Sequence, residues 1–168
     1  GEVRAVMQEK DVDGFTPRFE SLVAIYDHAV SSFPDRPLFG VKQGGAWTWM
    51  SYGEFAGQVD AVRAGLVALG VDKGDRVAVV ADNCPEWAVA AYATYRLGAA
   101  FVPMYESQHP DEWCYILADC GARAFITSAY KAEQAAELRD QMPAVTVRLM
   151  LDGVIAGEDE LLVYECDG

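Results

Sequence analysis

Apolar and polar positions between residues 75 and 127 alternate between the patterns of strands and of helices. Residues 76–81 read Arg-Val-Ala-Val-Val-Ala, an almost continuous apolar run, which predicts a strand buried on both faces. Residues 85–97 predict a helix, because Pro85 suits a first helical turn and Gly98 suits a left-handed position after the last turn. A buried strand is therefore followed directly by a helix.

Asn83 and Glu86 lie three residues apart at the start of this helix, which is the spacing of a capping box. In that motif the side chain of the first residue accepts a hydrogen bond from a backbone N–H of the first turn. We therefore expect Asn83 to cap the helix, and this role accounts for its amide without a ligand.

The alternation continues for one more cycle. Residues 101–104 predict a second strand, Pro110 opens a helix over residues 111–119 that Gly121 ends, and residues 124–127 predict a third strand. Strands joined by crossover helices lie parallel, with the helices covering the sheet. The chain is therefore predicted to have an α/β fold, a partial doubly wound and mostly parallel sheet flanked by helices.

The region before the sheet predicts a small N-terminal helix and a hairpin. Residues 19–32 carry apolar side chains at helical spacing. The apolar runs 38–41 and 46–49 flank a Gln-Gly-Gly turn, in which glycine accepts the positive φ of a tight hairpin.

Two further helices and one strand complete the prediction. Ser51 and Glu54 form a second capping box, which opens a helix that ends at Gly70. After the third strand, residues 131–141 predict a helix and residues 145–151 predict a fourth strand.

Composition narrows the class of protein. The chain has 168 residues, of which 52% are hydrophobic, enough for the core of one domain. Thirteen basic and 26 acidic residues give a net charge of −13, which opposes binding to nucleic acid and to anionic lipids. Arg96 interrupts the most hydrophobic helix, so no run is long enough for a transmembrane span. The cysteines lack C-x-x-C spacing and indicate reduced thiols of a cytoplasmic protein: Cys84, Cys114, Cys120 and Cys166.

Ligands of open α/β sheets bind beyond the carboxyl ends of the strands. A binding crevice is therefore expected, if the chain has one, near a small set of residues that follow the predicted strands. These residues are Asp82, Asn83, Tyr105, Glu106 and Ser128.

Other residues that could carry chemistry have simpler structural interpretations. His109, Cys114 and Cys120 match no standard zinc spacing and lack a fourth ligand, and His109 precedes Pro110 where a helix cap is expected. His28 is expected to be a solvated residue on the surface of the first helix.

Glu106, Asp111 and Glu112 could form an acid/base cluster, but acidic side chains near a helix N-terminus are ordinary partners of the helix dipole. Trp87 and Trp113 could line an acyl tunnel, but aromatic residues on crossover helices more often pack against the sheet. We find no nucleophile–base pair, and we assign no catalytic, cofactor-binding or metal-binding residue within the sequence.

Several short motifs in this region resemble, in order and spacing, the front part of acyl-CoA synthetases of the adenylate-forming ligase superfamily. The resemblance covers roughly residues 33–127, and its specificity comes from the co-occurrence of the motifs. The chain departs from the family pattern at Glu106, where a proline is expected. The motifs are Trp47-Thr48-Trp49-Met50-Ser51-Tyr52-Gly53-Glu54, Gly74-Asp75-Arg76-Val77, Asn83-x-Pro85-Glu86-Trp87, Gly98-Ala99-Ala100, Val102-Pro103 and Trp113-x-Tyr115-Ile116-Leu117.

The resemblance implies that the chain is an incomplete N-terminal part of a large AMP-binding domain. Residues 1–17 would form an extension, residues 18–73 the helix, hairpin and helix, residues 74–151 the βαβ core, and residues 152–168 a tail without an assigned element. The family's Ser/Thr/Gly-rich phosphate loop, its acidic ribose motif and its catalytic lysine domain are not found in the sequence. The fragment itself is therefore expected to be inactive.

By resemblance, the parent enzyme would use ATP and Mg²⁺ to activate a fatty acid as an acyl-adenylate, and would then transfer the acyl group to coenzyme A. It would have no transmembrane span, which leaves room for peripheral contact with a membrane. Alternatives within the superfamily are an aryl-acid ligase, a luciferase-like enzyme and a peptide-synthetase adenylation domain. An alternative outside it is a free-standing doubly wound binding module.

Overall fold

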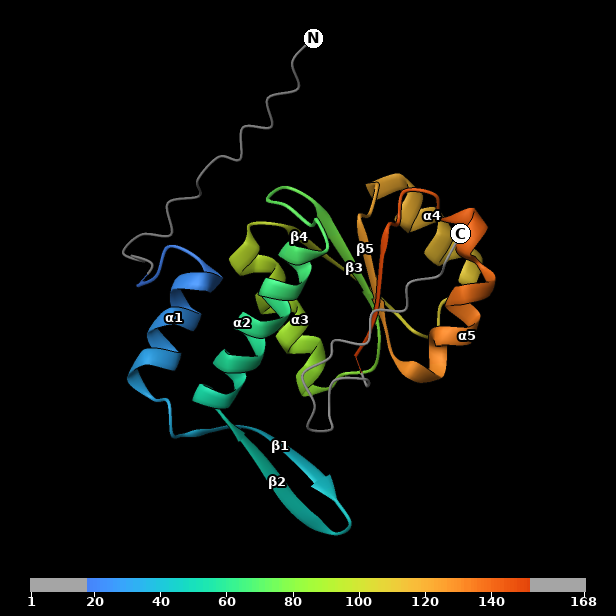
Figure 1. Cartoon of the computed structure of the whole chain (residues 1–168). Coiled ribbons are helices and arrows are strands. Elements are labelled where there is room, and N and C mark those ends of the chain that lie inside the picture. The colour runs from blue at the N-terminus through green and yellow to red at the C-terminus, as the bar shows by residue number, and fades with distance from the viewer. Residues whose placement is uncertain (1–17, 152–168) are drawn as a thin grey trace, which may run out of the picture.

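The structure is a computed structural model that describes residues 18–151 (Figure 1). The predicted extension over residues 1–17 and the tail over residues 152–168 lie outside the described residues. The elements are α1 (Leu22–Ser32), β1 (Pro37–Gln43), β2 (Ala46–Ser51), α2 (Tyr52–Ala68), β3 (Arg76–Val80), α3 (Pro85–Leu97), β4 (Ala100–Met104), α4 (Pro110–Cys120), β5 (Ala124–Thr127), α5 (Ala129–Glu137), a 3₁₀ turn (Arg139–Gln141) and β6 (Val147–Met150).

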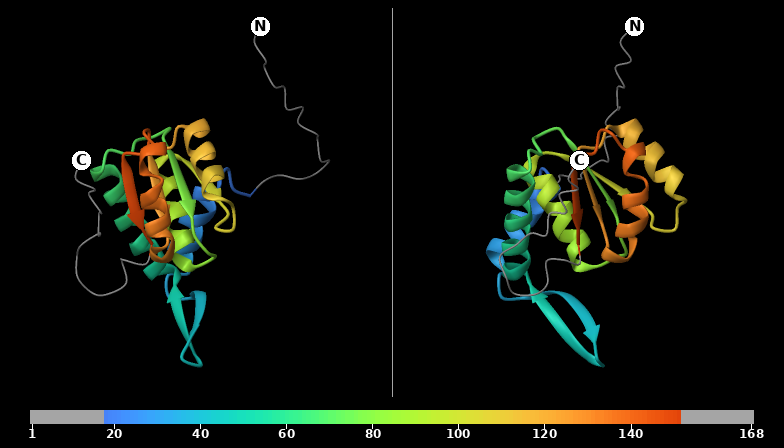
Figure 2. Two further views of the ribbon diagram at one scale, coloured as in Figure 1. Left: turned by 90° about the vertical axis from the view of Figure 1, so that its right-hand side faces the viewer. Right: turned by 45° about the vertical axis from the view of Figure 1, so that its right-hand side comes forward.

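Strands β3 to β6 form one parallel sheet in the order β4-β3-β5-β6. Helices α2 and α3 lie on one face of the sheet, and α4 and α5 lie on the other (Figure 2). This arrangement confirms the predicted partial doubly wound fold. The β1–β2 hairpin forms a separate antiparallel sheet and projects from the helical layer (Figure 1).

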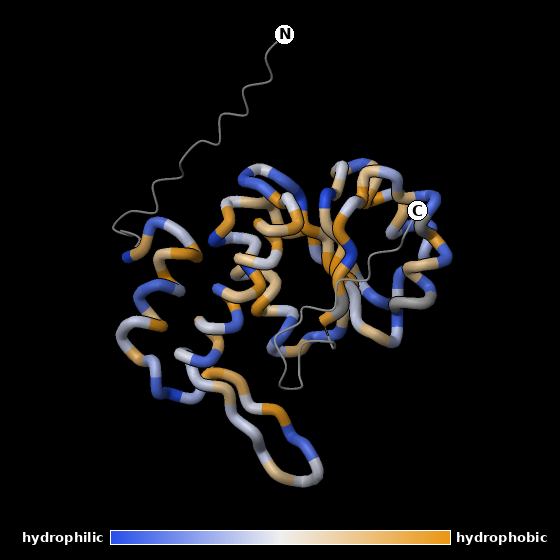
Figure 3. Tube along the Cα trace, in the orientation of Figure 1, coloured by the Kyte–Doolittle hydropathy of each residue, from blue (hydrophilic) through white to orange (hydrophobic). Residues whose placement is uncertain are grey.

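Alternate side chains of β3 enter two different cores. Val77 and Val79 pack with α2 and α3, while Ala78 and Val80 pack with α4 and α5. All four are completely buried, which explains why this strand is apolar at every position rather than at alternate ones. Figure 3 shows the hydrophobic colour concentrated along the central strands, and mixed colours on the helices.

Most of the predicted helix ends are confirmed by the hydrogen bonds of the caps. Ser51 Oγ accepts from the Glu54 N–H at 3.2 Å, and a Glu54 carboxylate oxygen accepts from the Ser51 N–H at 2.7 Å, so this capping box is complete. Gly98 and Gly121 follow α3 and α4 in the left-handed conformation, with φ of 76° and 60°.

Some element boundaries differ from the prediction for local reasons. Helix α1 begins at Leu22 rather than Phe19, because Ser21 Oγ caps it by accepting from the Ala24 N–H at 3.1 Å. The predicted helix over residues 131–141 divides into α5 and the 3₁₀ turn. The hairpin strands extend beyond the predicted apolar runs on both sides of the turn.

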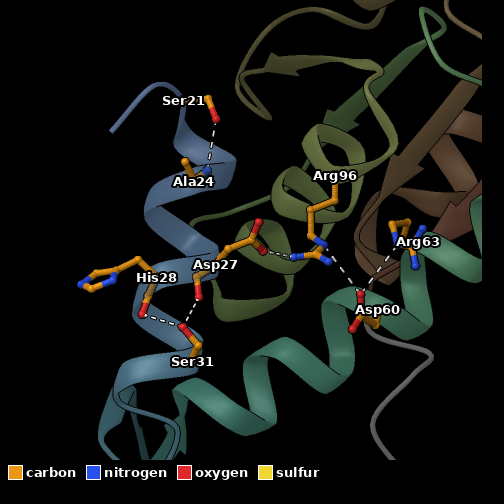
Figure 4. Close-up of polar contacts among 8 residues, drawn as sticks. All are labelled: Ser21, Ala24, Asp27, His28, Ser31, Asp60, Arg63 and Arg96. Carbon is orange, nitrogen blue, oxygen red and sulfur yellow. Dashed lines mark hydrogen bonds and ion pairs between the residues drawn. The ribbon is translucent and has the colours of Figure 1, made fainter. Parts of the chain in front are cut away.

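Arg96 connects the three helices on one side of the molecule (Figure 4). Its guanidinium donates to Asp27 of α1, lies 3.7 Å from Asp60 of α2, and sits 5.0 Å from the ring centroid of Tyr26. Burial raises the pKa of Tyr26, and the positive charge of Arg96 acts in the opposite direction. An ion pair and a cation–π contact therefore hold helix α1 against α3.

Candidate functional site

The candidate site lies where the helices following two adjacent strands diverge. Strands β3 and β5 are neighbours, but α3 follows β3 onto one face of the sheet and α5 follows β5 onto the other (Figure 2). In doubly wound sheets, the crevice between such strands is the usual place for ligands. Ser128 lies at this point, where its N–H donates to Val80 O at 3.3 Å.

The strand register brings Asp82 and Glu106 together. Val80 and Met104 are paired across β3 and β4, and each acidic residue follows two positions later. Burial is the largest cause that raises the pKa of Glu106, and the nearby carboxyl group of Asp82 with its negative charge raises that pKa further. Lys131 lowers the pKa of Glu106, but by less than the other causes combined.

The neighbouring polar groups complete this cluster. The Tyr130 hydroxyl donates to Asp82 Oδ2 at 3.2 Å. The Glu106 Oε2 atom and the Ser128 Oγ atom are both shielded from solvent and have no hydrogen-bond partner. A carboxyl group with a raised pKa, close to a second carboxyl group and to an ammonium group, can bind or release a proton, but it provides no nucleophile.

The aromatic core positions the loop that carries Glu106. Trp113 of α4 is 1% exposed, and its indole N–H donates to Tyr105 O at 3.0 Å. Lys131 Nζ lies 5.6 Å from the centroid of the Trp113 ring and donates to Gln134 Oε1 at 3.4 Å. Trp113 therefore packs in the core and also fixes the backbone after β4.

Asp111 and Glu112 occupy the positions expected of helix-dipole partners, whereas Glu106 has different neighbours. Asp111 and Glu112 are exposed in the first turn of α4, as dipole partners of that helix. Glu106 lies before the helix and faces Asp82 instead. Asp82 and Glu106 each lie two residues after the end of an apolar strand, and this equal spacing could have predicted their contact. That prediction would have required knowing that β3 and β4 are adjacent in the sheet.

We predict that Glu106→Gln changes the pH dependence of stability. In the folded chain the pKa of Glu106 is raised above its ordinary value of 4.5, so the folded state binds more protons between the two pKa values. Stability therefore falls as pH rises through that window. Glu106→Gln should raise the melting temperature near pH 7, and the gain should shrink toward pH 4.

Thermal unfolding across this pH range tests the prediction, with the exposed Glu137→Gln as the matched control. The control measures what the same substitution does at an exposed position, and the gain of Glu106→Gln near pH 7 should exceed it. A constant difference between Glu106→Gln and the original chain at every pH would contradict a raised pKa for Glu106.

The prediction that Asn83 caps α3 is wrong. The N-cap of α3 is Cys84, which makes no side-chain capping hydrogen bond, and Asn83 lies exposed one position earlier. Pro85 occupies the first turn as expected, so the helix start itself is confirmed. Glu86 is then only two residues after the N-cap, which is one residue too close for a capping box.

This geometry predicts that Cys84→Ser stabilises the protein by roughly 0.5–1 kcal/mol, because serine is a strong N-cap residue. Asn83→Ala should change stability by less than about 0.5 kcal/mol, as for an exposed residue outside any cap. Urea unfolding of the two single variants measures both effects. A loss of about 1 kcal/mol in Asn83→Ala would restore Asn83 as the cap.

The remaining candidates have structural positions. His109 is the N-cap of α4, and its Nδ1 accepts from the Asp111 N–H at 3.4 Å, as expected. His28 is exposed, with its ring 5.2 Å from that of Phe19. Trp87 packs edge-on against Phe101 at a centroid distance of 5.1 Å, which confirms packing against the sheet.

Two other features are absent from the described residues. Within residues 18–151, no three acidic, histidine or cysteine side chains are grouped so that they could hold a metal ion. In the same part of the chain, no helix combines the length and the apolar character needed to cross a bilayer.

Comparison with known proteins identifies the family. The model of the family described as AMP-binding enzyme matches residues 26–165. The chain belongs to the AMP-binding enzyme family. This membership confirms the resemblance carried by the sequence motifs.

The relatives of this AMP-binding chain include ligases for long-chain fatty acids. A long-chain-fatty-acid–CoA ligase of Mycobacterium bovis is 33% identical over 121 residues, which cover 71% of this chain and 20% of the relative. The peroxisomal long chain acyl-CoA synthetase 7 of Arabidopsis thaliana is 27% identical over 151 residues, covering 87% of this chain and 21% of the relative. The chain thus spans about a fifth of the length of these relatives.

A solved structure supports the fold independently. The anthranilate CoA ligase AuaEII, in complex with anthranoyl-AMP, superposes with a TM-score of 0.72 at 21% identity. The match covers 80% of this chain and 25% of the ligase. The layered α/β arrangement is therefore that of the N-terminal region of adenylate-forming enzymes.

Proposed function

We propose that this chain is the N-terminal part of an ATP-dependent acyl-CoA ligase whose substrate is a fatty acid. The observation that carries the proposal is the similarity to long-chain-fatty-acid–CoA ligases over 71% of the chain. ATP would convert the fatty acid carboxylate into an acyl-adenylate with release of pyrophosphate, and the thiol of coenzyme A would then displace AMP. Mg²⁺ would neutralise the charge of the departing pyrophosphate.

The residues described here would act as scaffold in that reaction. The parallel sheet and its two helical layers would support the site, and the Asp82–Glu106 pair lies where a crevice is expected beyond the strand ends. An acidic pair disfavours phosphate groups at that point. The phosphate-binding residues are therefore expected in the polypeptide beyond this chain, and the parent is expected in the cytoplasm, free to contact membranes peripherally.

The product of the complete reading frame tests this proposal. It should be incubated with ATP, Mg²⁺ and coenzyme A, and with palmitate, octanoate, anthranilate or proline in separate reactions. We expect pyrophosphate release and loss of free thiol with palmitate. Activity confined to anthranilate or proline would reject the fatty acid and retain an adenylate-forming enzyme, and no activity with any acid would reject the proposal.

The 168-residue chain alone should show no turnover in the same assay, because its sequence has no Ser/Thr/Gly-rich phosphate loop. Host ligases must be removed before the measurement. Turnover that copurifies with the chain through two unrelated chromatographic steps would contradict this prediction.

A further inference from the structure

The β1–β2 hairpin has little support from the rest of the described chain. Its strands pair only with each other within residues 18–151, and the hairpin extends away from the helices (Figure 1). Phe39 and Met50, near its base, pack against the main core. A two-stranded sheet is marginally stable in water without further packing.

One face of this hairpin carries an ordered aromatic pair. Trp47 and Trp49 are 60% and 57% exposed, and their rings stack at a centroid distance of 6.0 Å. Gly40 lies opposite Trp49 in the register, and a Cβ atom on Gly40 would be only 2.8 Å from Trp49 Cζ3. The absence of that atom lets the Trp49 ring lie directly on the neighbouring strand.

The hairpin also differs in charge from the rest of the chain. Residues 37–51 include one lysine, Lys42, and no acidic residue, although the chain has 26 acidic residues and a net charge of −13. Lys42 lies opposite Trp47 in the register. The surface is therefore suited to an apolar partner without positive charge.

We propose that polypeptide beyond residue 168 of the complete ligase packs an apolar surface over Trp47 and Trp49 and pairs with a free edge of the hairpin. This inference rests on the proposed function, in which the chain is the N-terminal part of a longer enzyme. About four fifths of the length of these relatives lies outside the matched region, so a ligase of similar length would have ample polypeptide to cover the hairpin.

Two other occupants fit the surface less well. A second copy of the chain would bring another charge of −13, and two partly exposed tryptophans offer about 300 Å² per copy, well below the roughly 800 Å² per partner of a stable interface. A bilayer with anionic lipids would be repelled by the same net charge.

Hydrogen exchange in the product of the complete reading frame tests the proposal. Amides in peptides spanning residues 37–51 should exchange at least tenfold more slowly in that product than in the 168-residue chain. Equal exchange would overturn the proposal, as would a stop codon directly after residue 168. Protection that appears only with phosphatidylcholine vesicles, or only at high protein concentration, would overturn it in favour of a lipid or a second copy.

A substitution provides a second measurement. Trp47→Ala should lower the melting temperature of the complete product by several degrees, whereas it should have little effect on the 168-residue chain. Tyr115→Ala, which removes a 71% exposed aromatic side chain from α4, is the control. A Trp47→Ala effect no larger than that of Tyr115→Ala in the complete product would overturn the proposal, whatever acid the enzyme activates.

Discussion

Trp113→Ala should reduce the free energy of unfolding by about 3–5 kcal/mol, the usual cost of truncating a buried aromatic side chain to alanine. Trp113 is 1% exposed and fills the core between α4 and the sheet, next to Phe125 and Leu117. The substitution would also leave Tyr105 O without its hydrogen-bond donor. The loss is therefore expected from both the cavity and the loop that follows β4.

Urea unfolding followed by far-ultraviolet circular dichroism measures this effect without depending on tryptophan fluorescence. Trp113→Phe should recover part of the loss, because it restores ring volume but not the N–H donor. Tyr115→Ala, at an exposed position on the same helix, should change the free energy of unfolding by less than about 0.5 kcal/mol. A Trp113→Ala loss below about 1 kcal/mol would contradict the packing described here.

The sheet could be predicted from the sequence because its signals are local. The apolar run of β3, the proline at the start of α3 and the left-handed glycine after it are each legible within a few residues. Strand order was not predicted, because the order β4-β3-β5-β6 depends on which faces the crossover helices cover. That choice is made by packing between distant segments.

The candidate site was only partly predictable for the same reason. The positions beyond the strand ends were correctly expected to include Asp82, Glu106 and Ser128. Their interaction was not expected, because it depends on the register between β3 and β4. Asn83 was predicted as the N-cap because it is a favoured capping residue and lies three residues before Glu86. The helix begins one residue later, and its N-cap, Cys84, is not a residue type from which a cap would be predicted.

Arg76→Met should destabilise the chain by roughly 2–3 kcal/mol, because the guanidinium makes charge-assisted hydrogen bonds that methionine cannot replace. Arg76 Nε donates to Cys120 O at 2.7 Å, and Nη2 donates to Gly121 O at 2.6 Å. These carbonyl groups lie at the C-terminal end of α4, where a positive charge also interacts favourably with the helix dipole. Arg76 therefore joins the start of β3 to the end of α4, which follows more than 40 residues later.

The comparison of Arg76→Met, Arg76→Lys and Arg63→Met in urea unfolding tests this role. Arg76→Lys keeps the charge but loses the forked geometry, so its loss should lie between those of the original chain and Arg76→Met. Arg63 makes only a 3.7 Å contact with Asp60 on the surface, so Arg63→Met should cost no more than about 1 kcal/mol. If Arg76→Lys were as stable as the original chain, charge alone would account for the effect. If Arg76→Met cost no more than Arg63→Met, the hydrogen bonds to Cys120 and Gly121 would not contribute to stability.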